Sequence, residues 1–252
     1  MKIKVISAIL LLFLLPSLSA CAKNLNASPM PTSELTPTAT QTLTTTPVQI
    51  TPTVTETVTP DPTGDSSLLD PPGCKLPPED YTLLTVNGFL LNNRTFAMLQ
   101  HAEKLYGGEL EITGHAITQG SYTNSEAASF GTHSGGGAVD LSVMYKGTYR
   151  VAYDEIDDLI LSLRTAGFAA WLRDFDELYP GSPIHIHAIA IGDKQLSPPA
   201  VEQLTGKFGY FLGYSGIPQE DGIPKPDPHG GPLICFWMVA SGYPTQSVTF
   251  QN

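Results

Sequence analysis

The chain from Asp65 to Asn252 is predicted to form one α+β domain, in which a small antiparallel or mixed sheet is flanked by about three helices. Three observations favour this class. The segment 184–192 alternates in side-chain type, as a strand does. The pair Asn87-Gly88 separates two apolar segments, as in a tight hairpin. Capped segments with helical spacing of apolar residues lie between the predicted strands, and the length suffices for one core.

The first predicted elements are a hairpin and a helix. The hairpin covers 81–91, with a type I′ turn at Asn87-Gly88, because both central positions of that turn need a positive φ. The helix covers 93–106. Its N-cap is expected to be the asparagine at position 93, and Gly107 is its stop.

The later elements follow from the same rules. One helix begins with acidic residues, which the helix dipole favours, and another begins at Ser197-Pro198, a typical opening. Residues 215–232 are rich in proline and glycine and are expected to form a loop. In chain order, the predicted strands cover 110–118, 138–143, 168–172 and 184–192, and the later helices cover 154–166 and 197–212.

The N-terminus has the pattern of an export signal. Two lysines flank the start of an apolar stretch over 5–15, which is too short to span a bilayer. Leu-Ser-Ala-Cys at 18–21 resembles the bacterial lipobox, which implies that 1–20 is a removed signal peptide and that Cys21 carries a lipid. The protein is then anchored on the extracytoplasmic face of the cell membrane. The alternative is an ordinary signal peptide with an incidental cysteine.

Residues 21–64 are predicted to be a lipidated N-terminus and a stalk. Threonine and proline dominate 29–63, and so few apolar groups cannot offset the entropy cost of ordering the chain. We expect an extended tether that holds a monomeric domain, 65–252, away from the membrane. The net charge of −11 argues against nucleic acid as a partner, because its phosphates would be repelled.

The segment 119–140 contains the first half of a predicted metal site. His133 stands just before three glycines at 135–137. Their freedom at positive φ is expected to turn the backbone and bring Asp140 back towards the imidazole. Asp140 lies on the predicted strand 138–143, so its carboxylate points to one face of the sheet.

The second half of the site is the alternating segment 184–192. As a strand it is expected to put His185 and His187 on one face and the isoleucines on the other. Two imidazoles and one carboxylate suit zinc and leave a fourth position open for water. We therefore predict a Zn²⁺ ion bound by His133, Asp140 and His187. The alternative is a hydrogen-bonded structural cluster.

These residues resemble a known family. The pattern H-x-x-G-x-A-x-D, formed by His133, Gly136, Ala138 and Asp140, is similar to the first zinc motif of the D-alanyl-D-alanine carboxypeptidase family of metallopeptidases. That family is related to the lysostaphin-type enzymes and the Hedgehog signalling domain. His187 and the short strand after it resemble the second motif.

The resemblance covers roughly 86–192 and implies further site residues. The stretch 119–122 is similar to the family's Ser-Gly-Tyr-Arg type stretch, which lies beside the substrate, so Gln119 and Ser121 are expected to bind substrate. The family's acidic base stands three positions before the last histidine, and here that residue is Ile184. The His-x-His pattern is instead similar to lysostaphin-type enzymes, which implies that His185 is catalytic.

Two functions follow. The first is a zinc-dependent peptidase that acts on cell-wall peptides, either D-alanyl-D-alanine carboxypeptidase-like or an endopeptidase, with peptidoglycan peptides as its partners. The alternative is a catalytically inactive, zinc-containing lipoprotein that binds peptidoglycan, which the residue at Ile184 favours. If the protein is a peptidase, Asp174, Asp176 or Glu177 is a further candidate for the general base, less favoured than His185.

The remaining cysteines and histidines were assigned by compartment and environment. With Cys21 lipidated, Cys74 and Cys235 form an even pair in an exported chain, which predicts a disulfide; the alternative is two buried thiols. His101 is expected to have a surface or packing role, His229 to be a loop residue, and His115 is a candidate neighbour of the site.

Overall fold

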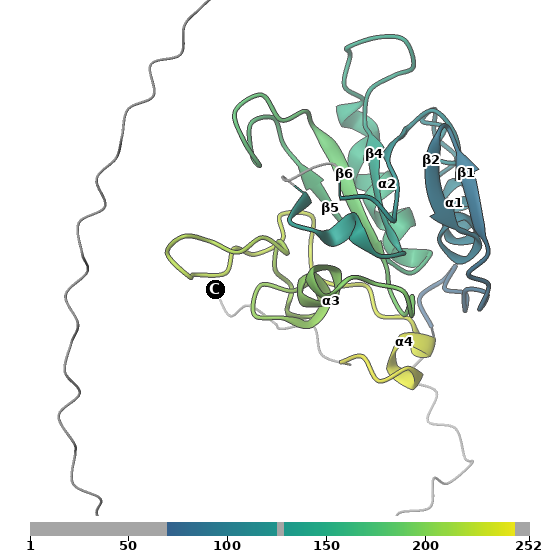
Figure 1. The fold of residues 1–252 in the computed structure, drawn as a ribbon, viewed down its shortest axis with the longest axis vertical. Coiled ribbons are helices and arrows are strands. Elements are labelled where there is room, and N and C mark those ends of the chain that lie inside the picture. The colour runs from purple at the N-terminus through teal and green to yellow at the C-terminus, as the bar shows by residue number, and fades with distance from the viewer. Residues whose placement is uncertain (1–69, 125–128, 245–252) are drawn as a thin grey trace, which may run out of the picture. The chain divides into compact units, whose positions relative to one another are not determined.

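The structure is a computed structural model and describes residues 70–124 and 129–244 (Figure 1). The predicted signal peptide, Cys21 and the stalk lie outside the described residues. In the part that is described, no helix has the length and apolar character needed to cross a membrane.

The fold is α+β, as predicted. A four-stranded antiparallel sheet has the order β3-β4-β6-β5, and a separate hairpin is formed by β1 and β2. The hairpin lies on the β4 side of the larger sheet, away from β5 (Figure 1). The strands are β1 (Leu83–Val86), β2 (Phe89–Asn92), β3 (Ile117–Gln119), β4 (Ala138–Ser142), β5 (Phe168–Arg173) and β6 (His185–Ala190). The helices are α1 (Asn93–Tyr106), α2 (Ile156–Thr165), α3 (Pro198–Thr205) and α4 (Phe236–Ala240), with 3₁₀ turns η2 (Thr132–Ser134), η3 (Tyr153–Glu155) and η4 (Tyr210–Leu212).

The hairpin forms as predicted. Asn87 and Gly88 have φ values of 48° and 85°, which are the two positive values of a type I′ turn. The Asn87 side chain also donates a hydrogen bond of 3.0 Å to the carbonyl of Ile117. The turn therefore ties the hairpin to β3, the edge strand of the larger sheet.

The N-cap of α1 is Asn92, and the prediction of Asn93 was wrong by one residue. The Asn92 side chain accepts a 2.8 Å hydrogen bond from the backbone N–H of Thr95. β2 continues to Asn92, whose extended backbone is the conformation that an N-cap needs. The stop at Gly107 is confirmed, because its φ is 62° and its N–H bonds the carbonyl of Glu103.

Two elements are much shorter than predicted, and the other boundaries agree to within about two residues. The strand expected over 110–118 is reduced to β3, because the backbone first folds into turns in which Gly114 and Ala116 both donate to the carbonyl of Glu111. The helix expected over 197–212 ends at Thr205, since Gly206 takes an extended conformation. The short helix α4 was not predicted; its five residues are too few to show a helical period.

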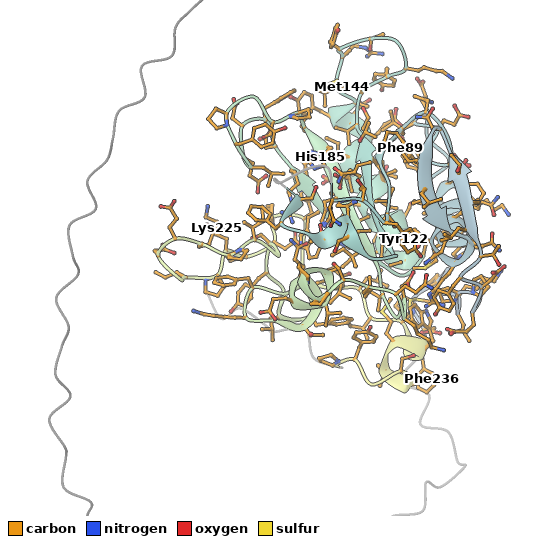
Figure 2. The ribbon with its side chains drawn as sticks, viewed as in Figure 1. Phe89, Tyr122, Met144, His185, Lys225 and Phe236 are labelled. Atoms are coloured by element: carbon orange, nitrogen blue, oxygen red, sulfur yellow. A yellow bond between two sulfur atoms is a disulfide. The ribbon has the colours of Figure 1, made fainter. Side chains whose placement is uncertain are left out.

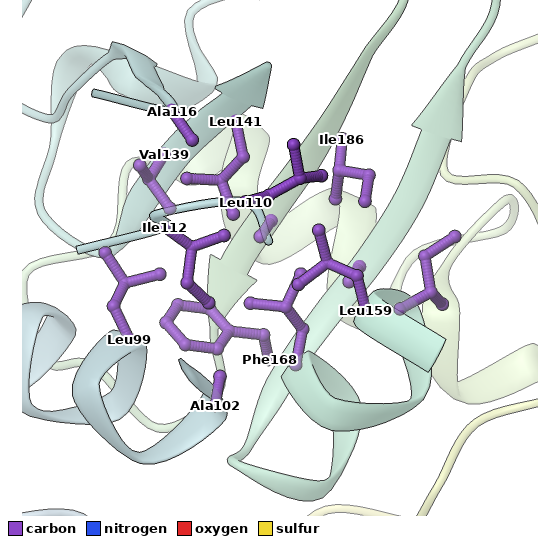
Figure 3. Close-up of a cluster of buried hydrophobic side chains, with 14 of the residues drawn as sticks. Leu99, Ala102, Leu110, Ile112, Ala116, Val139, Leu141, Leu159, Phe168 and Ile186 are labelled. Carbon is purple, nitrogen blue, oxygen red and sulfur yellow. The ribbon is translucent and has the colours of Figure 1, made fainter. Parts of the chain in front are cut away.

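One face of the four-stranded sheet is covered by α1 and α2 (Figure 3). Side chains of β4, β5 and β6 that point to this face include Leu141, Phe168 and Ile186, and all three are fully buried. The turns between α1 and β3 add Leu110 and Ile112 to the same cluster. This is the larger of the two apolar clusters and the main core of the domain.

The opposite face carries a second apolar cluster and the candidate site. Trp171 of β5 packs there with side chains of α3, η4 and α4. Ile189 and Ile191 also lie on this face, whereas Ile184 and Ile186 lie in the larger cluster on the other. The expectation that every isoleucine of this strand lies opposite the histidines was therefore wrong, because the odd-numbered isoleucines share the parity of His185 and His187.

The predicted disulfide is present between Cys74 and Cys235, with their Cα atoms 5.7 Å apart and 161 positions apart in sequence. Cys235 is fully buried in the second cluster. The bridge joins the segment before β1 to the residue before α4, so it ties together the two ends of the described domain.

Candidate metal centre

Three side chains of the second face converge at one point. Asp140 of β4 stands directly opposite His187 of β6 in the antiparallel ladder. Residues directly opposite in such a ladder point to the same face of a sheet, so the carboxylate and the imidazole meet. His133 reaches them from η2, in the loop that precedes β4. These three residues are buried and could together hold a metal ion.

The glycines at 135–137 contribute in two ways. Only Gly137 has a positive φ, 80°, so the predicted use of left-handed backbone applies to that residue alone. At Gly135 a Cβ atom would lie 2.3 Å from the carbonyl oxygen of Gln195, and at Gly136 it would lie 2.7 Å from the Tyr122 hydroxyl. These two glycines are needed because the loop packs closely against its neighbours.

The three potential ligand atoms form a small triangle. His187 Nδ1 lies 2.7 Å from Asp140 Oδ1. His133 Nε2 lies 3.2 Å from the same oxygen and 3.3 Å from His187 Nδ1. One small cation can therefore contact all three atoms at once.

The outer nitrogen of each imidazole is fixed by a hydrogen bond. His133 Nδ1 lies 2.8 Å from the backbone carbonyl of Gly120, and a carbonyl can only accept, so Nδ1 carries a proton and Nε2 is the nitrogen that faces the site. His187 Nε2 lies 3.1 Å from Gln203 Oε1, an acceptor that favours a proton on Nε2 and therefore a ligating lone pair on Nδ1. Such partners select the tautomer that a metal ligand needs. Gln203, on α3, was not singled out from the sequence.

Burial and charge set the protonation of the three groups. Burial would raise the pKa of Asp140, but the neighbouring His133 holds it well below its ordinary value. Burial lowers the pKa of His187 to about 4, so this imidazole is neutral at pH 7. Burial would also lower the pKa of His133, but the Asp140 carboxylate outweighs it and raises that pKa. The site therefore holds one ionised carboxylate beside imidazoles, which suits a cation.

His185 lies beside the triangle without belonging to it. Its Nδ1 lies 2.9 Å from the carbonyl of Pro183, so Nε2 is the bare nitrogen. Nε2 is 3.8 Å from Asp140 Oδ2, too far for a hydrogen bond. His185 thus presents a lone pair next to the candidate metal position.

The site lies in a pocket of about 630 Å³. Its walls come from the hairpin, the loop 118–123, the residues after β4, and the segment before β6. Figure 2 labels four of the lining residues, Phe89, Tyr122, Met144 and His185. Among the described residues that line the pocket, Asp140 is the only acidic one and Arg173 the only lysine or arginine. The pocket thus brings the three histidines together with one carboxylate and one guanidinium.

The predicted substrate residues also line the pocket. Gln119 donates a 2.9 Å hydrogen bond to the Ser129 hydroxyl. The Ser121 hydroxyl donates to the carbonyl of Ala138 at 2.8 Å, so its single proton is already engaged. Both residues lie where a ligand would pass, and their binding role stays a prediction.

The alternative bases and the other histidines lie elsewhere. Asp174, Asp176 and Glu177 are not among the pocket-lining residues. Ile184 packs in the larger cluster and also contributes to the pocket lining, but it has no acidic group. His101 contacts the carbonyl of Gly73, His115 pairs with Glu111, and His229 pairs with Asp157. None of these three histidines lines the pocket, and His229 lies in a turn, as expected of a loop residue.

Comparison of the chain with protein-family models, with curated proteins and with solved structures finds no match.

Proposed function

We propose that this domain is a zinc-dependent peptidase that acts on cell-wall peptides. One observation carries the proposal: a ring nitrogen of His133 and one of His187 meet a carboxylate oxygen of Asp140 in a pocket, with His185 beside them. The resemblance of the two histidine motifs to D-alanyl-D-alanine carboxypeptidases and lysostaphin-type enzymes supports the substrate class.

The donor set fits zinc. A zinc ion binds imidazole nitrogen and carboxylate oxygen at about 2.0–2.2 Å, so neighbouring ligands of a tetrahedral ion are about 3.3 Å apart. The three separations here, 2.7, 3.2 and 3.3 Å, need only a small expansion to reach that value. Three protein ligands leave a fourth position open towards the pocket, as in catalytic rather than structural zinc sites.

The residues of this chain divide the reaction between them. When bound, zinc supplies a Lewis acid that polarises the scissile carbonyl and favours ionisation of water. His185 Nε2 takes a proton from the attacking water as its oxygen forms a bond to the carbonyl carbon. The C–N bond then breaks, and the same proton passes to the leaving amine. Gln203 and Gly120 keep His187 and His133 in their ligating tautomers.

A second candidate is a catalytically silent lipoprotein that binds peptidoglycan and keeps the ion for recognition. The observation that favours it is the lack of a carboxylic base: among the described pocket-lining residues, the only carboxylate is that of Asp140, which is itself a candidate metal ligand. Under this alternative, His185 contacts bound peptide without moving a proton.

Hydrolysis of purified peptidoglycan separates the two functions. The full-length protein in detergent is incubated with peptidoglycan, and released peptides or amino acids are identified by mass spectrometry. We expect products with zinc, none with an excess of chelator, and products again when zinc is restored. The variant His101→Ala, whose histidine lies outside the pocket, serves as the matched control and should remain active. Binding without release under all conditions would favour the silent lipoprotein.

A further inference from the structure

Arg173 is a buried cation in the wall of the same pocket. It is the last residue of β5, and it stands directly opposite His185 in the ladder with β6. The next pair on the same face of the sheet is Trp171 and His187, the row that contains a candidate metal ligand. Because paired residues point to the same face, the Arg173 side chain lies on the site face of the sheet, one row beyond the candidate ligands. Arg173 is only 3% exposed.

The guanidinium of Arg173 lacks a close partner. Within the described part of the chain, its Nη2 is buried and makes no hydrogen bond. Glu177 forms a long ion pair with it, in which Oε1 is 3.8 Å from Nη1 and so beyond hydrogen-bonding distance, and Asp140 and Asp227 act on it only through their charge. The group stands 5.3 Å from the centre of the Trp171 ring, which offers only a weak attraction.

Two other buried arginines, Arg94 and Arg164, show what hydrogen-bond partners a structural arginine has in this protein. Arg94 donates to the carbonyls of Pro78 and Ile191 at 3.0 and 3.1 Å. Arg164 donates twice to the carbonyl of Ala170 and also pairs with a buried aspartate. Among the described residues no hydrogen-bond acceptor for Arg173 is found, although it is as deeply buried; Arg94 also has one unbonded nitrogen, Nε, but its other nitrogens are bonded. Arg173 lines the pocket of the candidate site, which the other two arginines do not.

A buried charge without a close partner is costly, because it loses its hydration without gaining hydrogen bonds. Burial lowers the pKa of Arg173 to about 10, so the guanidinium still carries its charge at pH 7. An anionic group that enters the pocket would supply the missing acceptors. Arginine suits a carboxylate in particular, since its planar fork can bond both oxygens.

We propose that Arg173 binds a carboxylate of the peptide substrate close to the scissile bond, an inference that rests on the proposed peptidase function. Residues two positions apart on a strand are about 6.6–6.8 Å apart, which separates the Arg173 row from the row of Trp171 and His187. One amino-acid residue of a peptide spans about 3.8 Å. The remaining distance between the two rows is taken up by the contact of its carboxylate with Arg173 and the contact of its scissile carbonyl with the metal position. This spacing favours the C-terminal carboxylate of a peptide that loses one residue. A side-chain carboxylate has the same chemistry.

The test measures binding separately from cleavage. Isothermal titration calorimetry is run on the full-length protein in detergent, with a chelator present so that no peptide is cut. The probes are acetyl-D-alanyl-D-alanine as the free acid, its C-terminal amide, and acetyl-D-glutamyl-D-alanine amide. We expect the free acid to bind about 10- to 100-fold more tightly than the amide. Tight binding of acetyl-D-glutamyl-D-alanine amide would instead identify a side-chain carboxylate as the group that Arg173 binds.

Variants then assign the preference to Arg173. In Arg173→Gln the preference for a carboxylate should disappear, and in Arg173→Lys part of it should remain. Arg150→Gln, which removes an exposed arginine that stacks on Tyr145, is the matched control and should keep the preference. Retention of the full preference in Arg173→Gln would overturn the inference. If that variant does not fold, as judged by circular dichroism, equal binding of acid and amide by the unchanged protein overturns it.

The outcome is independent of the proposed function. Hydrolysis of the same peptides is measured on the zinc-loaded protein. A carboxylate preference without any hydrolysis would remove the peptidase function and leave the anion site in place. If the acid and the amide bind equally and are hydrolysed at equal rates, the peptidase function stands and the anion site at Arg173 is overturned.

Discussion

His187 Nδ1 lies 2.7 Å from Asp140 Oδ1, across the ladder that joins β6 to β4. The two residues are 47 positions apart in sequence, and the antiparallel register places them directly opposite each other. His187 also contacts Gln203 of α3 through its other ring nitrogen. One imidazole therefore joins the sheet to a covering helix and keeps one nitrogen directed at the candidate metal position.

Loss of the contact from Gln203 should weaken metal binding. Gln203→Leu keeps the bulk of the side chain but removes the acceptor that holds the His187 proton on Nε2. Changes of this kind typically cost 10- to 100-fold in metal affinity. Affinity is measured by competition with a chromophoric chelator. Gln219→Leu, on a loop outside the pocket, is the control, and equal affinity in both variants would contradict the role of Gln203.

His185→Ala should separate metal binding from catalysis. His185 lies outside the ligand triangle, so the variant should keep its zinc. It loses the group that takes the proton from water, and hydrolysis should fall by about 10²- to 10⁴-fold. Zinc content and initial rate are measured on the same preparation. Unchanged hydrolysis would show that another group is the base.

Zinc binding should release a proton in mildly acidic solution. The Asp140 carboxylate raises the pKa of His133, so below that pKa a proton occupies the nitrogen that zinc needs. Asp140 is ionised and His187 neutral over the same range, because their pKa values are lowered. Affinity should therefore fall by about tenfold for each pH unit below the pKa of His133.

Calorimetry in two buffers with different heats of ionisation counts the released proton. We expect about one proton per zinc at pH 5.5 and progressively fewer as the pH rises above the pKa of His133. The same proton count at every pH would contradict the assignment of His133 as a ligand.

The disulfide should stabilise the domain. By chain entropy alone, closing a loop of 161 residues constrains the unfolded chain by about 5 kcal/mol, which is an upper figure. The double variant Cys74→Ala/Cys235→Ala is compared with the unchanged protein by urea unfolding. A lower midpoint with an unaltered metal affinity is expected, because neither cysteine lines the pocket or contacts the three candidate ligands. An unchanged midpoint would show that the bridge contributes little.

Much of the site could be predicted because its determinants are local. His133 and Asp140 share one short motif, and alternation alone puts His185 and His187 on one face. The turn at Asn87 and the pairing of Cys74 also follow from short-range chemistry and the cell compartment.

Residues placed by long-range packing could not be predicted. Gln203 reaches His187 only because α3 folds back over the sheet, and Arg173 enters the pocket only through the β5–β6 register. Leu110 and Ile112 are apolar and buried, and the alternation of such residues with polar ones is typical of a strand. A turn that packs against the core can have the same alternation. An alternating sequence pattern indicates which side chains are buried, but it does not distinguish a strand from a turn. Here the backbone forms a turn, in which the N–H groups of Gly114 and Ala116 donate to the carbonyl of Glu111.

The central claim is that one zinc ion is bound by His133, Asp140 and His187. Its most direct test is the zinc content of purified protein, measured by inductively coupled plasma mass spectrometry after dialysis against zinc and then against metal-free buffer. We predict about one zinc per chain in the unchanged protein and in His101→Ala, and very little in His187→Ala. Equal zinc content in His187→Ala and the unchanged protein would contradict the account.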